Sequence, residues 1–211
     1  MALSVAPKLF ASDRSRAWLL TLTSALVMTV GGLGFAFAFF ASTEQINHFP
    51  LLDVGWANAI CSCFISFLAA DMVLGYLYFK SEVNWLTGWV HHIGYSIVVF
   101  GCIQHRVAGG FLTFASLLEL PSIPLSLGHI KKAWRRDYLF GVLFFATRVL
   151  VNFYVILHVR VAYPHSNFYL VTAAPLPLHI FWFYNWVQQQ IRIRKHKHTD
   201  TATAATVKKM E

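Results

Sequence analysis

The chain has 211 residues, of which 57% are apolar, 16% aromatic and 12% charged, with 17 Lys and Arg against 9 Asp and Glu. Soluble domains carry roughly a quarter of their residues as charged groups, so this chain has about half the charge that a water-facing globule needs. The composition excludes an ordinary soluble enzyme and indicates a membrane protein. The basic excess leaves a nucleic-acid binder open until the positions of the basic residues are considered.

Long windows with few or no charges predict membrane-spanning helices, because about 20 apolar residues cross the hydrocarbon core of a bilayer. The first window exceeds the apolar core of a cleaved secretory signal, so we expect a retained helix there. In chain order, the six predicted spans are Trp18–Ala41, Gly55–Phe79, Leu86–Gln104, Val107–Leu127, Tyr138–His158 and Phe168–Val187. The expected fold is all-α, a six-transmembrane-helix bundle of a polytopic membrane protein.

These spans divide the chain into four parts. Residues 1–17 form a short N-terminus and residues 18–41 the first transmembrane helix. Residues 55–187 form the helical core. Residues 188–211 form a basic tail, which ends in an Ala/Thr-rich run and is expected to be disordered.

The basic residues cluster on one side of the predicted bundle. With six spans, the N-terminus, the second and fourth loops and the tail share that side and hold 14 of the 17 basic residues. The opposite side holds Arg106 and Arg160, and Arg148 lies inside a span. Because positive loops stay in the cytosol, both termini are predicted to be cytosolic. The same asymmetry explains the basic charge without nucleic acid as a partner.

Two lysines stand close to the end of the chain, at Lys208 and Lys209, before Met210 and Glu211. Lysines at the third and fourth positions from a cytosolic C-terminus form a receptor-read address that returns membrane proteins to the endoplasmic reticulum. The expected partner of these lysines is the coat protein that reads this dilysine signal. The alternative is a basic tail that ends in two lysines by chance.

Ionisable side chains inside the spans are costly in hydrocarbon and indicate function by default. Counting 1.5 Å per residue from the span ends gives Asp71 and Glu119 similar depth, His91 and His92 a shallower position and Arg148 a position near mid-membrane. Five spans therefore offer polar groups to the same, cytosolic half of the bilayer. We therefore predict a polar chamber that opens toward the cytosol or the cytosolic leaflet. The residues expected there are Asp71, His91, His92, Glu119, Arg148 and His179.

The adjacent histidines His91 and His92 are the predicted catalytic residues of this chamber. A neutral imidazole takes a proton or accepts an acyl group near pH 7, and Asp71 or Glu119 would orient it. Tyr95 stands four residues after His91, and Ser96 stands four residues after His92, so each histidine has a hydroxyl neighbour on its own helix face. Tyr95 and Ser96 are predicted to contact a bound lipid.

Arg148 and Asn152 are also four residues apart and are predicted, with His179, to bind lipid through donated hydrogen bonds. The alternative is that Arg148 only pairs with Glu119 or Asp71 and holds the bundle together. Glu119 lies in the segment LELPSIP at 118–124, where two prolines remove backbone donors and disturb a helix. We expect an irregular stretch there, which membrane proteins tolerate where it lines a cavity.

Neither a metal nor another cofactor is expected. The histidines lack the repeated spacing of three or four residues found in membrane hydroxylases, and the chain has no H-E-x-x-H sequence. All three cysteines fall within predicted spans and are interpreted as small packing residues: Cys61, Cys63 and Cys102. The chain also lacks a G-x-S-x-G elbow and a dinucleotide fingerprint.

Four segments together resemble the TLC domain, the family that includes ceramide synthases, translocation-associated membrane proteins, the ceroid-lipofuscinosis transmembrane protein and small TLC domain-containing proteins. The resemblance covers the second to the sixth span, and so the 55–187 core. It rests on the order and spacing of Asp, His-His, Glu and Arg. The segments are ADMVLGY at 70–76, WVHHIGYS at 89–96, LELPS at 118–122 and ATRV at 146–149.

Ceramide synthases transfer an acyl group from acyl-CoA to a sphingoid amine and depend on their histidine doublet. They also carry a His-Asp-x-x-Asp cluster on the next helix, where this chain has Glu119 followed by Leu-Pro-Ser. The chain is therefore more similar to the small TLC proteins, whose proposed roles are lipid homeostasis, sensing and trafficking.

The sequence predicts an endoplasmic-reticulum membrane protein that binds a lipid or acyl chain in an intramembrane cavity and acts in lipid homeostasis. One alternative is an acyltransferase of ceramide-synthase type, acting on sphingolipids through the His91-His92 doublet with acyl-CoA as co-substrate. The other is a non-catalytic scaffold or trafficking protein whose buried polar groups only hold helices together. Membrane lipids are the expected partners in the first two cases.

Overall fold

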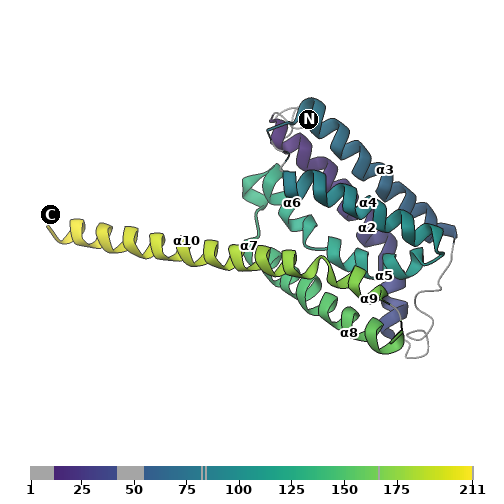
Figure 1. Cartoon of the computed structure of the whole chain (residues 1–211). Helices are drawn as coiled ribbons and strands as arrows, with labels where there is room; N and C mark the ends of the chain where they lie inside the picture. Colours follow the sequence, from purple (N-terminus) through teal and green to yellow (C-terminus); the bar gives the residue numbers. More distant parts are fainter. Residues whose placement is uncertain (1–11, 42–54, 82, 84, 166, 211) are drawn as a thin grey trace.

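The computed structural model describes residues 12–41, 55–81, 83, 85–165 and 167–210, and all regular structure in this part is helical (Figure 1). The all-α prediction is confirmed. In chain order the elements are α2 (Asp13–Ala41), α3 (Gly55–Tyr78), the π-helical η3 (Trp85–Val90), α4 (His91–Gln104), α5 (Ala108–Glu119), α6 (Ser122–Ile130), the 3-10 turn η4 (Lys132–Trp134), α7 (Asp137–Phe144), the π-helical η5 (Phe145–Val151), α8 (Asn152–Ala162), α9 (Phe168–Ala173) and α10 (Leu176–Met210).

Several of these helices are long and apolar enough to cross a membrane. Within the described residues they are Asp13–Ala38, Gly55–Tyr78 and Asp137–Val161, and a fourth if the bent pair α5 and α6 forms one span. The predicted spans Leu86–Gln104 and Phe168–Val187 are not among them. The first is divided between η3 and α4, and the second between α9 and α10.

The outward-facing side chains of the long helices are largely apolar. Val30 and Phe37 on α2 are 70% and 77% exposed, and Val161 on α8 is 80% exposed. Extensive exposed apolar surface is unfavourable in water and ordinary in a bilayer. The surface therefore fits a multi-pass membrane protein.

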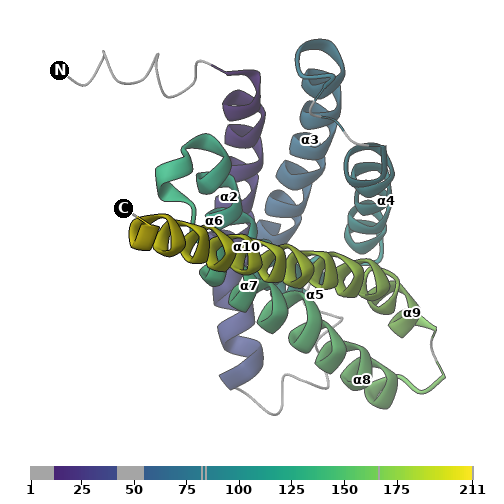
Figure 2. The same cartoon turned by 90° about the vertical axis from the view of Figure 1, so that its left-hand side faces the viewer.

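The helix α2 packs along α5, α6 and α3 (Figures 1 and 2). Buried apolar residues of α2, α3, α4 and α5 form one core, among them Met28, Phe64, Val99 and Leu112. The chain from α7 to α8 forms a second layer with α9 and α10. The candidate site lies where these two groups of helices meet.

Two glycines bring α2 close to its neighbours. A Cβ atom on Gly32 would lie 2.4 Å from Cβ of Ser116 and 2.7 Å from the Leu112 carbonyl oxygen, both on α5. A Cβ atom on Gly31 would lie 2.5 Å from a terminal carbon of the Ile60 side chain on α3. Small residues permit such close backbone approach between membrane helices.

The irregular stretch predicted around Glu119 is confirmed. The helix α5 ends at Glu119, α6 begins at Ser122, and the two axes differ by 44°. Pro121 has no N–H to continue the helical hydrogen bonding, and the N–H of Leu120 instead donates to the Leu117 carbonyl at 3.2 Å. Glu119, the last residue of α5, therefore lies directly at the break.

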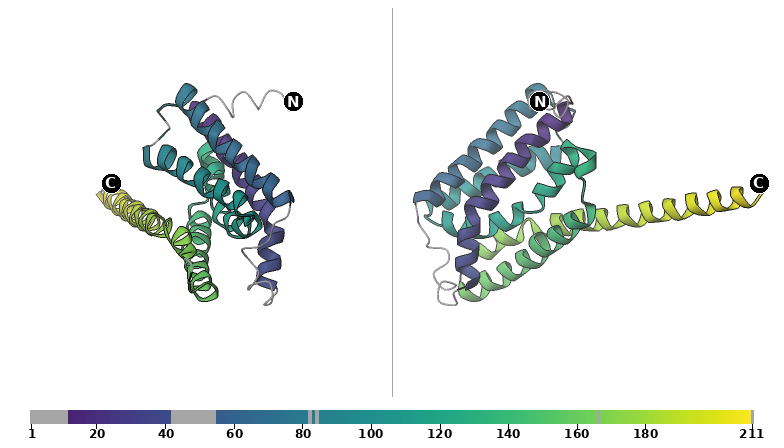
Figure 3. Two further views of the ribbon diagram at one scale, coloured as in Figure 1. Left: turned by 45° about the vertical axis from the view of Figure 1, so that its right-hand side comes forward. Right: turned by 180° about the vertical axis from the view of Figure 1, so that it is seen from behind.

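The tail differs from the predicted disordered segment, because α10 continues as one helix from Leu176 to Met210. It extends well beyond the other helices (Figure 3). No glycine or proline follows Pro177 to interrupt it. The side chains of Lys208 and Lys209 lie outside the described residues.

Candidate functional site

The structure brings five predicted site residues to one polar cavity of about 500 Å³. Asp71 reaches it from α3, and Glu119 from the end of α5. The histidines His91 and His92 reach it from the start of α4, and Arg148 from η5. Volumes of this size are typical of small-molecule sites. Residues that sequence analysis placed in the cytosolic half of different spans thus line one cavity.

The side chain of His92 is held by hydrogen bonds at both ring nitrogens. Nε2 lies 2.9 Å from Oδ2 of Asp71, and Nδ1 lies 2.6 Å from the Gly88 carbonyl oxygen. Since both neighbours are acceptors, the geometry fits an imidazolium that donates from both nitrogens. His92 is therefore fixed in orientation and has no nitrogen left to act as a base.

The neighbouring ring of His91 is placed differently. It contacts the rings of Tyr95, His92 and Trp182 at centroid distances of 4.4, 5.5 and 6.4 Å. Among the described residues, its nitrogens make no hydrogen bond. The doublet thus divides into one anchored histidine and one whose nitrogens are available to a ligand.

Arg148 holds the broken helix and pairs with Glu119. Its Nε donates to the Leu118 carbonyl at 2.7 Å, and its Nη2 donates to the Ser122 hydroxyl at 3.0 Å. The same Nη2 lies 3.6 Å from Oε1 of Glu119. The side chains are 11% and 17% exposed, so this ion pair is mostly buried. Arg148 therefore donates hydrogen bonds to the Leu118 carbonyl and the Ser122 hydroxyl, on either side of the break at Pro121.

The π-helical segment η5 explains the position of His179. His179 is 1% exposed, and its Nδ1 lies 3.0 Å from the backbone carbonyl oxygen of Arg148. In a π-helical turn the backbone hydrogen bonds depart from the regular i to i−4 pattern. Here the Arg148 carbonyl oxygen accepts a hydrogen bond from the His179 side chain instead. The Asn152 side chain lies 3.4 Å from the same nitrogen. His179 lines neither cavity and joins α10 to η5.

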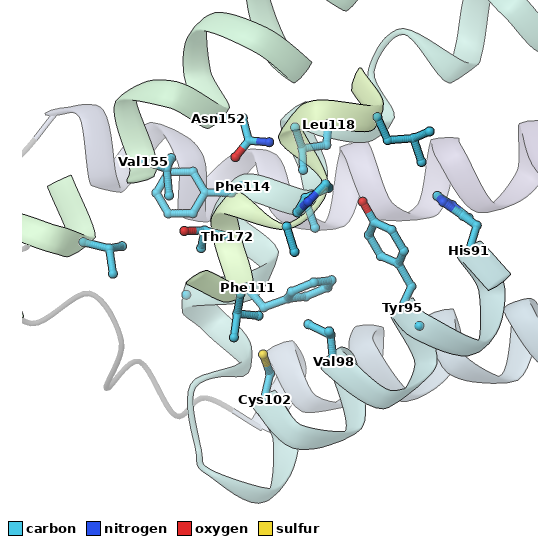
Figure 4. A pocket seen from close by; sticks show the side chains of 18 of the residues that line it. His91, Tyr95, Val98, Cys102, Phe111, Phe114, Leu118, Asn152, Val155 and Thr172 are labelled. Carbon is cyan, nitrogen blue, oxygen red and sulfur yellow. The ribbon is translucent and has the colours of Figure 1, made fainter. Parts of the chain in front are cut away.

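A second cavity of about 370 Å³ lies beside the first and is almost entirely apolar (Figure 4). Its lining residues come from η3, α4, α5, η5, α8 and α9 and from the start of α10. Tyr95 and Asn152, both predicted lipid-binding residues, line it, but Ser96 does not. Other lining residues include Val98, Cys102, Phe111, Phe114 and Val155.

His91 is a lining residue of both cavities. It therefore stands where the apolar space meets the polar space, and Tyr95 packs against it from the apolar side (Figure 4). This arrangement fits a molecule with an apolar chain on one side of His91 and a polar group on the other. An amphiphile has this division of polarity.

Sequence analysis missed one wall of the site. The helix α2 contributes Arg14, Trp18, Thr21 and Ser24 to the polar cavity. Their sequence signal is weak: Thr21 and Ser24 lie three residues apart and so on one helix face, but Thr23 and Thr29 also lie in this span. The first transmembrane helix therefore belongs to the site.

Comparisons of the chain with protein-family models, with curated proteins and with solved structures give no match. The interpretation of the site therefore rests on its geometry and on its residues.

Proposed function

We propose that the protein binds a lipid or acyl chain across the two cavities and acts in membrane lipid homeostasis. The position of His91 on both cavities is the observation that carries this proposal. The apolar cavity would hold the chain, and the polar cavity would hold the group to which the chain is attached. The resemblance to the small TLC proteins supports the same conclusion.

The proposal includes a six-span bundle of TLC type with both termini in the cytosol. Supporting it, basic side chains lie over aromatic rings at three places on the predicted cytosolic side. They are Lys80 over Tyr76 at 5.4 Å, Lys131 over Trp134 at 5.2 Å and Arg194 over Tyr138 at 5.8 Å. Basic residues are enriched on the cytosolic side, whereas Trp and Tyr are enriched at both membrane interfaces. One further pair of this kind, Arg160 over Tyr169 at 4.8 Å, lies on the predicted opposite side.

Filling the apolar cavity is expected to remove bound lipid. Gly94 lines this cavity, and a Cβ atom there meets no atom within 4 Å, so Gly94→Phe would place a ring in the space. Displacing two methylene groups of a chain costs about 1.6 kcal/mol, which is more than tenfold in affinity. The measurement is native mass spectrometry of lipid that remains bound to the purified protein.

Gly101→Phe is the matched control, because Gly101 lies seven residues further on the same helix, also meets no atom within 4 Å and lines neither cavity. It should retain the lipid. Equal lipid in wild type and in Gly94→Phe would contradict lipid binding here. The absence of lipid from all three proteins would favour the scaffold alternative.

The second candidate function is acyl transfer from acyl-CoA, and the available nitrogens of His91 favour it. One nitrogen would attack the thioester carbonyl and the CoA thiolate would leave, which gives an acyl-imidazole that a lipid amine or hydroxyl then deacylates. In the same spectra, a covalent mass increase of one acyl group, lost in His91→Ala, would establish this step. Bound lipid without such an adduct supports the first candidate.

The location proposed for the protein is the endoplasmic reticulum, and the terminal lysines would maintain it. Replacing both residues, Lys208→Ser with Lys209→Ser, should shift a tagged protein toward the Golgi in fluorescence microscopy. Lys195→Ser with Lys197→Ser removes the same charge elsewhere in the tail and should leave the location unchanged. If the protein with Lys208→Ser and Lys209→Ser stays in the endoplasmic reticulum, the dilysine signal is not used.

A further inference from the structure

One wall of the apolar cavity is buried among packed helices. Ala115 on α5 and Val155 and Val159 on α8 line the cavity, and none of the three is more than 5% exposed. Cys102, near the end of α4, lines the same cavity and is also buried. A bound molecule therefore reaches these side chains from inside the cavity.

The edge of the cavity along η3 and α4 is exposed. Five lining residues there stand four positions apart, and so follow one side of the chain, which we call the α4 rim: Leu86, Val90, Gly94, Val98 and Cys102. Leu86, Val90 and Gly94 are exposed. Val98 is half-buried, and Cys102 is buried. The cavity is therefore open along the first half of the α4 rim and closed at Cys102.

A second row of apolar lining residues comes from α9 and the start of α10. This α9 rim consists of Val171, Ala174, Pro175 and Leu178, and the first two are exposed. The exposed lining residues of the cavity all belong to these two rims. Within the described ranges, the extensive packing of α4 is with η3, α3 and α5, and that of α9 is with α8 and α10. The two rims therefore border an opening on the side of the molecule where α4 and α9 lie (Figure 2).

The surface around this opening is apolar. Ile97 and Phe100 on α4, and Leu170 and Phe181 beside the α9 rim, are all more than half exposed. The rim residues themselves carry no charge. An exposed apolar surface of this kind is unfavourable in water and ordinary in hydrocarbon. A molecule that enters here therefore comes from the bilayer and not from the cytosol.

The size of the cavity fits one hydrocarbon chain. A methylene group occupies nearly the same volume as a water molecule in the liquid, about 30 Å³. The cavity volume of about 370 Å³ therefore holds about 12 methylene groups. One chain of a membrane lipid fills this space, and a second chain has no room. A two-chain lipid can occupy the cavity because the opening leaves its second chain in the bilayer.

We infer that the apolar cavity opens laterally to the bilayer between the α4 rim and the α9 rim, and that it takes up one chain of a two-chain membrane lipid through this opening. This inference rests on the proposed lipid-binding function and on the proposed membrane topology. It adds the class of the ligand and the route by which the ligand enters. A water-soluble ligand would instead have to enter through the polar cavity.

Photolabelling from the bilayer tests this route. The full chain is placed in phosphatidylcholine nanodiscs that also contain a phosphatidylcholine with a diazirine in one chain, and labelled residues are identified by mass spectrometry after irradiation. We expect label on the outer residues Ile97 and Phe100 and also on the wall residues Val155 and Val159. The Val171→Trp variant, which places a large ring at the α9 rim, should lose the wall label and keep the outer label.

Leu170→Trp is the matched control, because Leu170 precedes Val171 on α9, is exposed and lines neither cavity. It should keep both labels. Outer label alone in the wild type, wall label that survives in Val171→Trp, or loss of the wall label in both variants would overturn the inference. If the purified wild type still retains lipid in native mass spectrometry, the proposed function stands without this route. Absence of both retained lipid and wall label would contradict the proposed function itself.

Discussion

Replacing Arg148 by methionine is expected to destabilise the protein by about 3–5 kcal/mol, the usual cost of leaving one charge of a buried pair without its partner. Glu119 would remain mostly buried without its cation, and the Leu118 carbonyl would lose the donor at 2.7 Å. For a chain of this size the melting temperature should fall by about 6–20 °C. Thermal unfolding of the purified protein in detergent measures this change.

A double-mutant cycle separates the ion pair from the arginine's other contacts. Adding Glu119→Gln to Arg148→Met removes the uncompensated charge and should recover part of the lost stability. The stability that is not recovered measures the two hydrogen bonds that Arg148 donates to the Leu118 carbonyl and the Ser122 hydroxyl. Arg160→Met is the control, because Arg160 is exposed and lies over the Tyr169 ring at 4.8 Å, a contact worth about 1 kcal/mol or less. An Arg148→Met protein as stable as the wild type would show that the pair does not hold the break.

Adding one methyl group at Gly32 is expected to destabilise the bundle by about 1–3 kcal/mol. In Gly32→Ala the new Cβ atom would lie 2.7 Å from the Leu112 carbonyl oxygen, a backbone atom that yields only if α5 moves. That movement also loosens the hydrogen bond from the Thr29 hydroxyl to the Ser116 carbonyl, now 3.3 Å long. Chromatographic recovery of monodisperse protein after heating measures the loss.

The matched control for this change is Gly34→Ala on the same helix, where the new Cβ atom meets no atom within 4 Å. Replacing glycine by alanine inside a helix is itself favourable by up to about 1 kcal/mol, so Gly34→Ala should be neutral or slightly stabilising. Equal stability of the two alanine variants would mean that α2 and α5 do not approach as closely as described.

Sequence patterns predicted the all-helical class and the break after Glu119 well, because both depend on local properties of the chain. Uncharged windows mark helices, and a proline pair marks the break after Glu119. Residue counting from span ends placed Asp71, His91 and Glu119 in the same half of the bilayer, and all three line one cavity in the structure.

Contacts between helices could not be predicted in the same way. The sequence left Arg148 with Glu119 or Asp71 as alternative partners, and the choice depends on how η5 packs against the end of α5. It also treated His91 and His92 alike, because adjacent residues differ only in direction around the helix axis. His92 is anchored because its ring faces Asp71 and the Gly88 carbonyl. Which neighbour each ring faces depends on how far α4 is rotated about its own axis. A single sequence contains little information about that rotation.

The uninterrupted helix α10 joins the tail of the chain to the candidate site. Its first turns supply Leu178 to the apolar cavity and Trp182 to the polar one, and His179 contacts η5. The same helix runs on to Met210, outside the body of the molecule (Figure 1). One element therefore forms part of the wall of both cavities and also carries the basic tail.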